Sequence, residues 1–372
     1  MKAIIDLVAG ARPNFMKLAP VVRALSEVDN VAFRVVHTGQ HYDDSMNDVF
    51  FRELGIPEPD VHLEVGSGSH GSQTARILER YEAHLLKHKP AATVVFGDVN
   101  STIACALAAV KLGVQVAHVE AGLRSFDRTM PEEINRLLTD AVSDLLLVSE
   151  PSGIENLRRE GVPENKIRLV GNVMIDTLLR QLETARSQQA AKALGLEKKK
   201  YGFVTIHRPS NVDEANTLKS LLNLLHELAA AMPMVFSVHP RTSASAKRLG
   251  LESLLQSTAK RLFCIPPQPY LDSISLVADA AVVLTDSGGL QEETSILGIP
   301  CMTLRENTER PITVKLGTSR LVGNDPQKIR AAFQEVLSGT WPRGQTIPLW
   351  DGKAAHRVVK ELVDWLENAG QK

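Results

Sequence analysis

The sequence predicts an α/β protein with two doubly wound, Rossmann-like domains that face each other across a cleft. Three observations lead to this prediction. Short apolar runs typical of buried parallel strands alternate with longer segments that have helical spacing. This alternation pauses near Gly171-Asn172 and begins again at Tyr201. With 372 residues, the chain is also too long for one ordinary hydrophobic core.

We therefore predict an N-terminal α/β domain over residues 1–172 and a C-terminal α/β domain over residues 173–354. An amphipathic pattern near the C-terminus predicts a last helix, residues 355–372, that packs back on the first domain. The segment 173–199 is predicted to be one helix with a lysine-rich end.

Composition excludes several functional classes. The net charge is −1, so neither nucleic-acid binding nor a polybasic membrane surface is indicated. The three cysteines form no Cys-x-x-Cys pair, which argues against structural zinc and fits a reducing cytoplasm. No apolar run approaches the length of a membrane span. We thus expect a cytoplasmic protein with no metal site and no nucleic-acid or membrane partner.

The first candidate site follows the first strand, Ala3 to Ala9. Gly10-Ala11-Arg12-Pro13 turns this strand into a helix, and proline suits the first helical position. Arg12 and Lys17 then flank a helix N-terminus at the carboxyl end of a strand, where open α/β sheets bind ligands. Two cations there favour an anionic ligand such as phosphate. Solvated surface charges are the alternative, above all for Lys17.

Three carboxylates are expected on the same rim of the first domain. Asp98 follows a strand at residues 93–96, Glu120 ends a strand that begins at Gln115, and Glu132 lies in the first turn of a helix. Each has an ordinary explanation as a helix cap or a partner of the helix dipole. Together they match proton abstraction and return, which require paired acids with separable pKa values.

Two other patterns in the first half carry less weight. Residues 66–71 contain a G-x-G-x-x-G, but it does not follow the first strand and lacks the acidic residue expected further on. We interpret it as a mobile Gly/Ser loop, and the missing NAD fingerprint argues against hydride transfer. His84 and His88 have i,i+4 spacing without the glutamate of a metalloprotease motif, so we predict surface histidines.

In the second half, the clearest candidate is the run TDSGGLQEE, Thr285 to Glu293. The apolar residues 278–284 precede it and a helical pattern follows, so the run is a strand-to-helix turn. Backbone N–H groups near Ser287 and Gly288, together with the helix dipole, favour a phosphate. Glu293 can cap the helix or accept hydrogen bonds from sugar hydroxyls. A turn that only caps a helix is the alternative.

His207 is a further candidate in the second half. It ends a predicted strand, residues 201–206, and Arg208 follows it directly. His239 ends the next strand in the same way. A histidine at such a position can belong to the core or cap a helix, but the neighbouring arginine favours a ligand-binding role for His207. Both domains therefore offer loops suited to phosphate.

These motifs resemble those of the non-hydrolysing UDP-N-acetylglucosamine 2-epimerases, along nearly the whole chain. The matching segments are Gly10-Ala11-Arg12-Pro13 with Lys17, Gly97-Asp98, His118 to Arg124, Pro131 to Arg136, Thr205 to Arg208, Thr285 to Glu293, and Thr308 to Pro311. The resemblance implies the two-domain glycosyltransferase-B fold, a UDP-sugar as substrate, no cofactor, and a homodimer. It also implies a role in cell-surface polysaccharide synthesis.

The resemblance further implies a mechanism. Enzymes of this family expel UDP by anti elimination, leaving a 2-acetamidoglucal, and add UDP back after C-2 is protonated on the other face. The catalytic residues would be Asp98, Glu120, Glu132 and His207, with the acid and base roles among the carboxylates left open. The residues that bind the substrate and UDP would be Arg12, Lys17, Arg136, Ser287, Gly288 and Glu293.

Several alternatives stay open. A relative could act on a UDP-2,3-diacetamido uronic acid, although the segment Arg305 to Pro311 looks closer to the N-acetylglucosamine enzymes. A glycosyltransferase of the same fold would need an acceptor site. A hydrolysing relative would release free N-acetylmannosamine, and a sugar-nucleotide sensor would bind without turnover.

One departure from the family concerns regulation. Many bacterial members hold a second UDP-N-acetylglucosamine partly through a Gln-His-Arg run, where this chain has Gln40-His41-Tyr42 followed by Asp43 and Asp44. Loss of a bidentate cation and gain of two carboxylates disfavour a diphosphate. We therefore predict hyperbolic kinetics without activation by a second substrate molecule.

Overall fold

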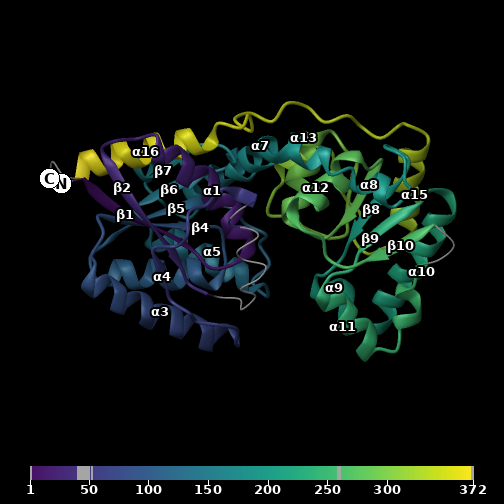
Figure 1. Ribbon diagram of the computed structural model, residues 1–372, viewed down its shortest axis with the longest axis horizontal. Coiled ribbons are helices and arrows are strands. Elements are labelled where there is room, and N and C mark those ends of the chain that lie inside the picture. The colour runs from purple at the N-terminus through teal and green to yellow at the C-terminus, as the bar shows by residue number, and fades with distance from the viewer. Residues whose placement is uncertain (1, 40–50, 52, 258–260, 370–372) are drawn as a thin grey trace. The chain divides into compact units, whose positions relative to one another are not determined.

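The computed structural model of the protein describes residues 2–39, 51, 53–257 and 261–369. The chain divides into two compact units: unit 1 comprises residues 1–177 and 348–372, and unit 2 comprises residues 178–347. Each unit is built around one parallel sheet with helices on its faces (Figure 1). Residues 40–47, on which the prediction about regulation depends, lie outside the described residues.

Unit 1 has a seven-stranded sheet in the order β3-β2-β1-β4-β5-β6-β7. Its strands are β1 (Ala3–Ala9), β2 (Val31–His37), β3 (Val61–His62), β4 (Ala92–Phe96), β5 (Gln115–Ala121), β6 (Leu145–Val148) and β7 (Ile167–Leu169). Its helices are α1 (Arg12–Ser26), α3 (His70–Lys87), α4 (Asn100–Lys111), α5 (Pro131–Val142), α6 (Pro151–Arg159), η1 (Glu164–Lys166) and α16 (Ala354–Ala369). The strand order reverses between β1 and β4, where such sheets bind ligands.

Unit 2 repeats this plan with six strands in the order β10-β9-β8-β11-β12-β13. The strands are β8 (Gly202–Thr205), β9 (Met234–Ser237), β10 (Leu262–Ile265), β11 (Val282–Thr285), β12 (Cys301–Thr303) and β13 (Ser319–Leu321). The helices are α8 (Ala190–Ala193), α9 (Pro209–Val212), α10 (Ala215–Ala231), α11 (Pro240–Arg248), η2 (Glu252–Leu255), α12 (Tyr270–Asp279), α13 (Gly288–Leu297), α14 (Ile312–Lys315) and α15 (Pro326–Leu337). The order reverses between β8 and β11.

Helices cover both faces of each sheet, so the central strands are buried and mostly apolar. Every residue of β4, β6 and β11 is buried, as expected for parallel strands in a doubly wound fold. The predicted class, two doubly wound α/β domains, is thereby confirmed.

The boundary between the units lies inside α7 (Val173–Ser187), after Thr177, whereas the sequence placed it just before this helix. The C-terminal helix α16 belongs to unit 1 and packs against α1, as the yellow and purple helices in Figure 1 show. Asp176 of α7 holds the start of α16, since its two carboxylate oxygens accept hydrogen bonds from the N–H groups of Ala354 and Ala355, at 3.1 and 2.7 Å.

Two predicted elements differ from the structure. The single helix over 173–199 is wrong: α7 ends at Ser187, Gln189 is left-handed at φ 50°, and the short α8 follows. The turn lets Ala191 pack with Tyr201 in the core of unit 2. The predicted strand over 278–284 also begins too early, because its first two residues end α12. A short apolar run does not distinguish a strand from a buried helix end.

The prediction that His84 is a surface residue is wrong, although His88 is exposed. His84 is buried, and its Nε2 lies 3.1 Å from an oxygen of Asp6 in β1. Arg34 also pairs with this carboxylate, at 2.7 Å. Sequence spacing within α3 could not reveal an acid on the strand beneath it.

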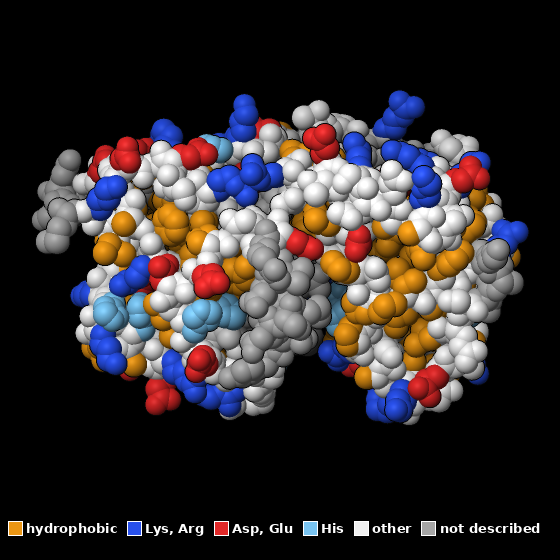
Figure 2. Space-filling view, viewed as in Figure 1, with side chains coloured by type: hydrophobic (Ala, Val, Ile, Leu, Met, Phe, Trp, Pro, Cys, Tyr) orange, Lys and Arg blue, Asp and Glu red, His pale blue; other side chains and the backbone are white. Residues whose placement is uncertain are grey.

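Acidic and basic side chains are interspersed on the face shown in Figure 2, in keeping with the net charge of −1. Among the described residues, no helix is both long and apolar enough to cross a membrane.

Candidate active site

The turn after β1 packs tightly against two hydroxyl groups. A Cβ atom at Gly10 would lie 2.1 Å from both Ser101 Oγ and Thr38 Oγ1, so only glycine fits. Arg12 begins α1, and the structure describes its backbone only. Lys17, further along α1, is buried, and its Nζ lies 2.8 Å from Glu120 Oε2. Lys17 is therefore not a solvated surface charge, and its contact with a ligand stays a prediction.

Glu120 lies at an irregularity of β5. The pairing of β5 with β6 shifts register between Val119 and Ala121, and Glu120 between them has φ 76°. A positive φ at a residue with a side chain costs about 1–3 kcal/mol and concentrates at functional sites. A bulge of this kind redirects the side chain, here into the contact with Lys17.

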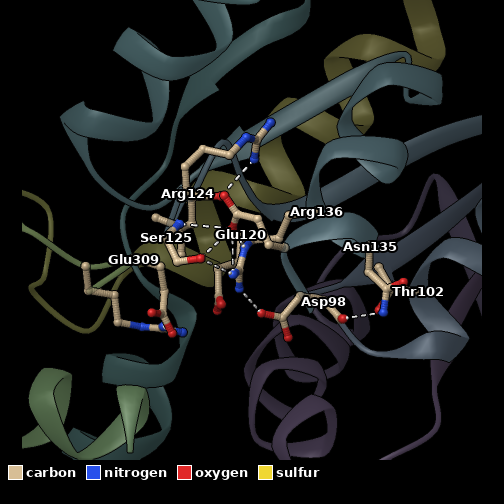
Figure 3. A network of polar contacts seen from close by, with 12 residues as sticks. Asp98, Thr102, Glu120, Arg124, Ser125, Asn135, Arg136 and Glu309 are labelled. Carbon is tan, nitrogen blue, oxygen red and sulfur yellow. Dashed lines mark hydrogen bonds and ion pairs between the residues drawn. The ribbon is translucent and has the colours of Figure 1, made fainter. Parts of the chain in front are cut away.

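Asp98 is held by α5, in the network shown in Figure 3. Arg136 donates from Nη1 to Asp98 Oδ2, and Asn135 donates to the Asp98 carbonyl oxygen at 2.9 Å. The Asp98 side chain keeps 22% of its surface exposed, while Arg136 is buried. Asp98 thus presents a carboxylate whose charge is compensated from the protein side.

The two adjacent glutamates of α5 have different surroundings. Glu132 is half-buried, whereas Glu133 is 1% exposed. Glu133 accepts hydrogen bonds from the N–H groups of Ser125 and Phe126, at 2.9 and 2.8 Å, and from Arg136 at 2.7 Å. Burial raises the pKa of Glu133, but the hydrogen bonds from Ser125 and Arg136 outweigh burial and lower it. Glu133 therefore orders both the loop after β5 and the arginine on Asp98.

A second buried carboxylate on α5 supports the same loops. Asp140 pairs with Arg124 at 2.7 Å, accepts from the Gly122 N–H at 3.0 Å, and lies 2.6 Å from His118 Nδ1. Burial raises its pKa, but the charges and hydrogen bonds of His118 and Arg124 outweigh burial and lower it. At Gly122, φ is 80° and a Cβ would meet the Gly153 carbonyl oxygen at 2.5 Å, so this close contact requires glycine.

In unit 2, His207 and Asp286 lie at the carboxyl ends of the adjacent strands β8 and β11. His207 Nδ1 is 2.9 Å from Asp286 Oδ1, and the imidazole is 31% exposed. Asp286 is fully buried and also accepts from the N–H of Arg208 at 2.8 Å and from Asn211 at 3.0 Å. Burial raises the Asp286 pKa, but the contacts with His207 and the N–H of Arg208 outweigh burial and lower it. A fixed carboxylate thus sets the orientation of His207.

The N-terminus of α13 lies against positive charge. Ser287 is the N-cap residue, and a Cβ at Gly288 would lie 2.6 Å from Arg310 Nη1. Arg310 donates to Glu292 at 2.6 Å and to Glu309 at 2.7 Å. Two further arginines, Arg305 at 2.8 Å and Arg208 at 3.8 Å, pair with Glu309. A helix N-terminus beside arginines is suited to an anionic ligand.

Glu293 lies in surroundings that raise the pKa of its carboxyl group. It is buried, and burial together with the neighbouring Glu292 raises its pKa to about 8, against a hydrogen bond from Tyr270 that lowers it. Burial and the neighbouring Glu293 carboxylate raise the pKa of Tyr270 well above its usual value. A carboxyl group that is protonated at neutral pH can donate as well as accept hydrogen bonds.

The structure thus brings Lys17, Asp98, Glu120 and Arg136 into the polar network of unit 1, with Glu132 on the same helix as Arg136. In unit 2, it places His207, Ser287, Gly288 and Glu293 at neighbouring strand ends and on α13. Sequence reasoning gave no role to a set of buried partners: Glu133, Asp140, Asp286, Glu309 and Arg310. All lie beside or inside the quoted motifs, but nothing in the sequence distinguished Glu133 from Glu132.

Comparison with known proteins gives concordant matches. A family model described as UDP-N-acetylglucosamine 2-epimerase matches residues 23–363. The UDP-N-acetylglucosamine 2-epimerase of Methanocaldococcus jannaschii is 43% identical over 363 residues, which cover 96% of this chain and 98% of that protein. The UDP-2,3-diacetamido-2,3-dideoxy-D-glucuronate 2-epimerase of Pseudomonas aeruginosa is 44% identical over 361 residues, covering 95% and 98%.

Solved structures agree. A crystal structure of a Methanocaldococcus jannaschii UDP-GlcNAc 2-epimerase in complex with UDP-GlcNAc and UDP matches with a TM-score of 0.90 at 42% identity, covering 97% of this chain and 99% of that one. A lipopolysaccharide outer core galactosyltransferase matches with a TM-score of 0.53 at 13% identity, covering 97% and 99%, which shows the fold alone. This likeness accords with the predicted relation to the glycosyltransferase-B fold.

Proposed function

The chain belongs to the UDP-N-acetylglucosamine 2-epimerase family, and from this premise we propose that it interconverts UDP-N-acetylglucosamine and UDP-N-acetylmannosamine. The observation that carries the proposal is the polar network of unit 1. There, two carboxylates at strand ends are each paired with a cation from a helix: Glu120 with Lys17, and Asp98 with Arg136. Such pairs suit a reaction that takes a proton from carbon and later returns one.

In the mechanism we propose, a carboxylate of unit 1 removes the C-2 proton while the bond from C-1 to the UDP oxygen breaks. The products of this step are 2-acetamidoglucal and UDP. The return step delivers a proton to the opposite face of C-2 and re-forms the bond from C-1 to UDP. Asp98, Glu120 and Glu132 share the proton transfers, and Arg136 anchors the sugar side through its contact with Asp98.

Unit 2 holds the departing diphosphate in this proposal. Negative charge grows on the leaving oxygen, and groups already oriented toward that position stabilise it. His207, oriented by Asp286, and the N–H groups at the start of α13 supply such donors. Glu293 binds the ribose hydroxyls, and Arg12 keeps the diphosphate-binding role that the family resemblance implies.

The experiment that tests the proposal is proton NMR of the protein with UDP-N-acetylglucosamine in deuterium oxide. Elimination and re-addition place solvent deuterium at C-2 of the epimerised product, and free glycal and UDP accumulate in small amounts. Epimerised product that keeps its original hydrogen at C-2 would refute the mechanism. Release of free N-acetylmannosamine would point instead to a hydrolysing enzyme.

A second candidate is the 2-epimerisation of a UDP-2,3-diacetamido uronic acid. The observation that favours it is the 44% identity to the Pseudomonas aeruginosa enzyme named for that substrate. The two candidates differ by a carboxylate at C-6 and an acetamido group at C-3, so comparison of kcat/KM for the two nucleotide sugars distinguishes them. Turnover of the uronate alone would replace the first proposal.

We place this activity in the cytoplasm, in a homodimer, as a supplier of activated N-acetylmannosamine for cell-surface polysaccharide. The basis is the family resemblance and the absence of any Cys-x-x-Cys pair in the sequence. Light scattering on the purified protein tests the dimer, and loss of the polysaccharide on deletion of the protein tests the role.

A further inference from the structure

His118 lies on β5, two residues before Glu120, and is fully buried. Both of its ring nitrogens have partners. Nε2 is 2.7 Å from the carbonyl oxygen of Gly97, and Nδ1 is 2.6 Å from Asp140 Oδ1. A carbonyl oxygen only accepts hydrogen bonds, so Nε2 carries hydrogen. The other carboxylate oxygen of Asp140 accepts from the Gly122 N–H at 3.0 Å and pairs with Arg124 at 2.7 Å.

We propose that His118 is a positioning residue for the epimerisation, which sets the place of Asp98 through the carbonyl group of Gly97. Gly97 directly precedes Asp98 and has φ 62°, a conformation that favours glycine, and a Cβ there would lie 2.6 Å from Lys17 Nζ. Its N–H donates to the Val119 carbonyl oxygen at 3.0 Å. Gly97, the residue before Asp98, is thus fastened to β5 through both its N–H and its carbonyl oxygen.

Asp140 extends this connection to the other candidate acids. One carboxylate oxygen of Asp140 contacts His118. The other accepts a hydrogen bond at 3.0 Å from the N–H of Gly122, which lies two residues after Glu120 in the chain. Asp140 belongs to α5, the helix that also carries Glu132. The His118–Asp140 pair therefore joins the three segments that carry the three acids. Proton transfer depends steeply on distance, so a small shift of one segment lowers the rate.

The proposal rests on the epimerase function proposed above and adds a role that neither the motifs nor the acids themselves require. If His118 only satisfied polar groups in the core, loss of either ring-nitrogen contact would lower stability and have a similar effect on the rate. A positioning role makes the Nε2 contact with Gly97 dominant for the rate. The two contacts can be separated by substitution, because the glutamine amide nitrogen lies near the place of Nε2 and that of asparagine lies near the place of Nδ1.

The test compares His118→Asn with His118→Gln. His118→Asn keeps a donor toward Asp140 and loses the one toward Gly97, so we expect kcat to fall about 10²-fold, the typical effect of a misplacement of about 1 Å. His118→Gln keeps the donor toward Gly97, so it should recover most of that loss. The dissociation constant of UDP, measured by calorimetry, should be the same in both variants and the wild type.

Equal loss of kcat in the two variants, or no loss in either, would overturn the proposal. Urea unfolding of both variants controls for stability. Should either variant fail to fold, the wild-type protein still decides. Long-range proton–nitrogen NMR of His118 is expected to show hydrogen on Nε2, which faces the Gly97 carbonyl oxygen, and a bare Nε2 would overturn the proposal. A wild type that binds UDP but turns over no UDP-sugar would refute the proposed function instead, independently of the ring-nitrogen result.

Discussion

The ammonium group of Lys17 and the carboxylate of Glu120 form an ion pair at 2.8 Å, with only 6% and 3% of the two side chains exposed. Removal of one member of such a pair leaves a buried charge without its partner, which costs about 3–5 kcal/mol. We expect Lys17→Met to lower the free energy of unfolding of unit 1 by that order. The double variant Lys17→Met/Glu120→Gln should recover part of the loss. Urea unfolding of the wild type, Lys17→Met, Glu120→Gln and the double variant measures the coupling energy between the two residues. Losses that simply add in the double variant would contradict the prediction.

The neighbouring residues Glu132 and Glu133 should differ in what they control. Glu133→Gln removes the negative charge and one of the two acceptor oxygens that bind Ser125, Phe126 and Arg136, so both unfolding stability and kcat should fall. Glu132→Gln should leave stability nearly unchanged and lower kcat by about 10²–10⁴, the usual effect of losing a proton-transfer group. Thermal unfolding beside initial rates separates the two. Equal stability loss in both variants would refute the assignment.

Substitutions in the two units should divide rate from affinity. Asp98→Asn should cut kcat and leave UDP binding nearly intact, because the carboxylates act on the sugar. His207→Ala should weaken UDP binding itself, while Asp286 keeps its hydrogen bonds from the N–H of Arg208 and from Asn211. Isothermal calorimetry with UDP, which lacks the N-acetylated sugar, measures the dissociation constant of each variant. The same loss of UDP affinity in both variants would be the contrary result.

The raised pKa of Glu293, about 8 in the folded protein, links stability to pH. Below pH about 4.5, the usual glutamate range, this carboxyl is protonated in both folded and unfolded chains. Between that pH and about 8, the unfolded chain releases the proton and the folded chain retains it, so stability falls as pH rises. The fall is at most about 1.4 kcal/mol per pH unit. In Glu293→Gln it should disappear, so the variant gains stability over the wild type as pH rises through this window.

A matched control is Glu214, an exposed N-cap of α10 whose pKa is lowered by hydrogen bonds from the N–H groups of Asn216 and Thr217. Glu214→Gln removes this stabilisation, which in the wild type is present above pH about 4.5 and is lost as pH falls below that value. Between pH 5 and 8 the curve of this variant should therefore run parallel to that of the wild type, at a lower stability. Urea unfolding of both variants and the wild type from about pH 3 to 8 covers both windows. Parallel curves for Glu293→Gln and the wild type would contradict the prediction.

Much of the fold follows from local pattern. The alternation of apolar strands and helical segments predicts two parallel sheets, and Pro13 and Gly298 mark where helices begin and end, because their backbone preferences act without distant partners. The same reasoning fails where an apolar run is short. Residues 278–284 are divided between α12 and β11, and only packing against the sheets decides where helix ends and strand begins.

The sequence by itself determined the fold class, the family, and the strand ends and helix start at which the candidate acids lie, since these depend on periodicity and on motifs of neighbouring residues. Only the tertiary structure decided which side chains contact each other. It placed Lys17 on Glu120 across 103 positions of the chain, turned His84 inward onto Asp6, and buried Glu133 while leaving Glu132 half-exposed. Charge compensation and burial join residues that are distant in sequence. They therefore emerge only when the strands and helices are packed together.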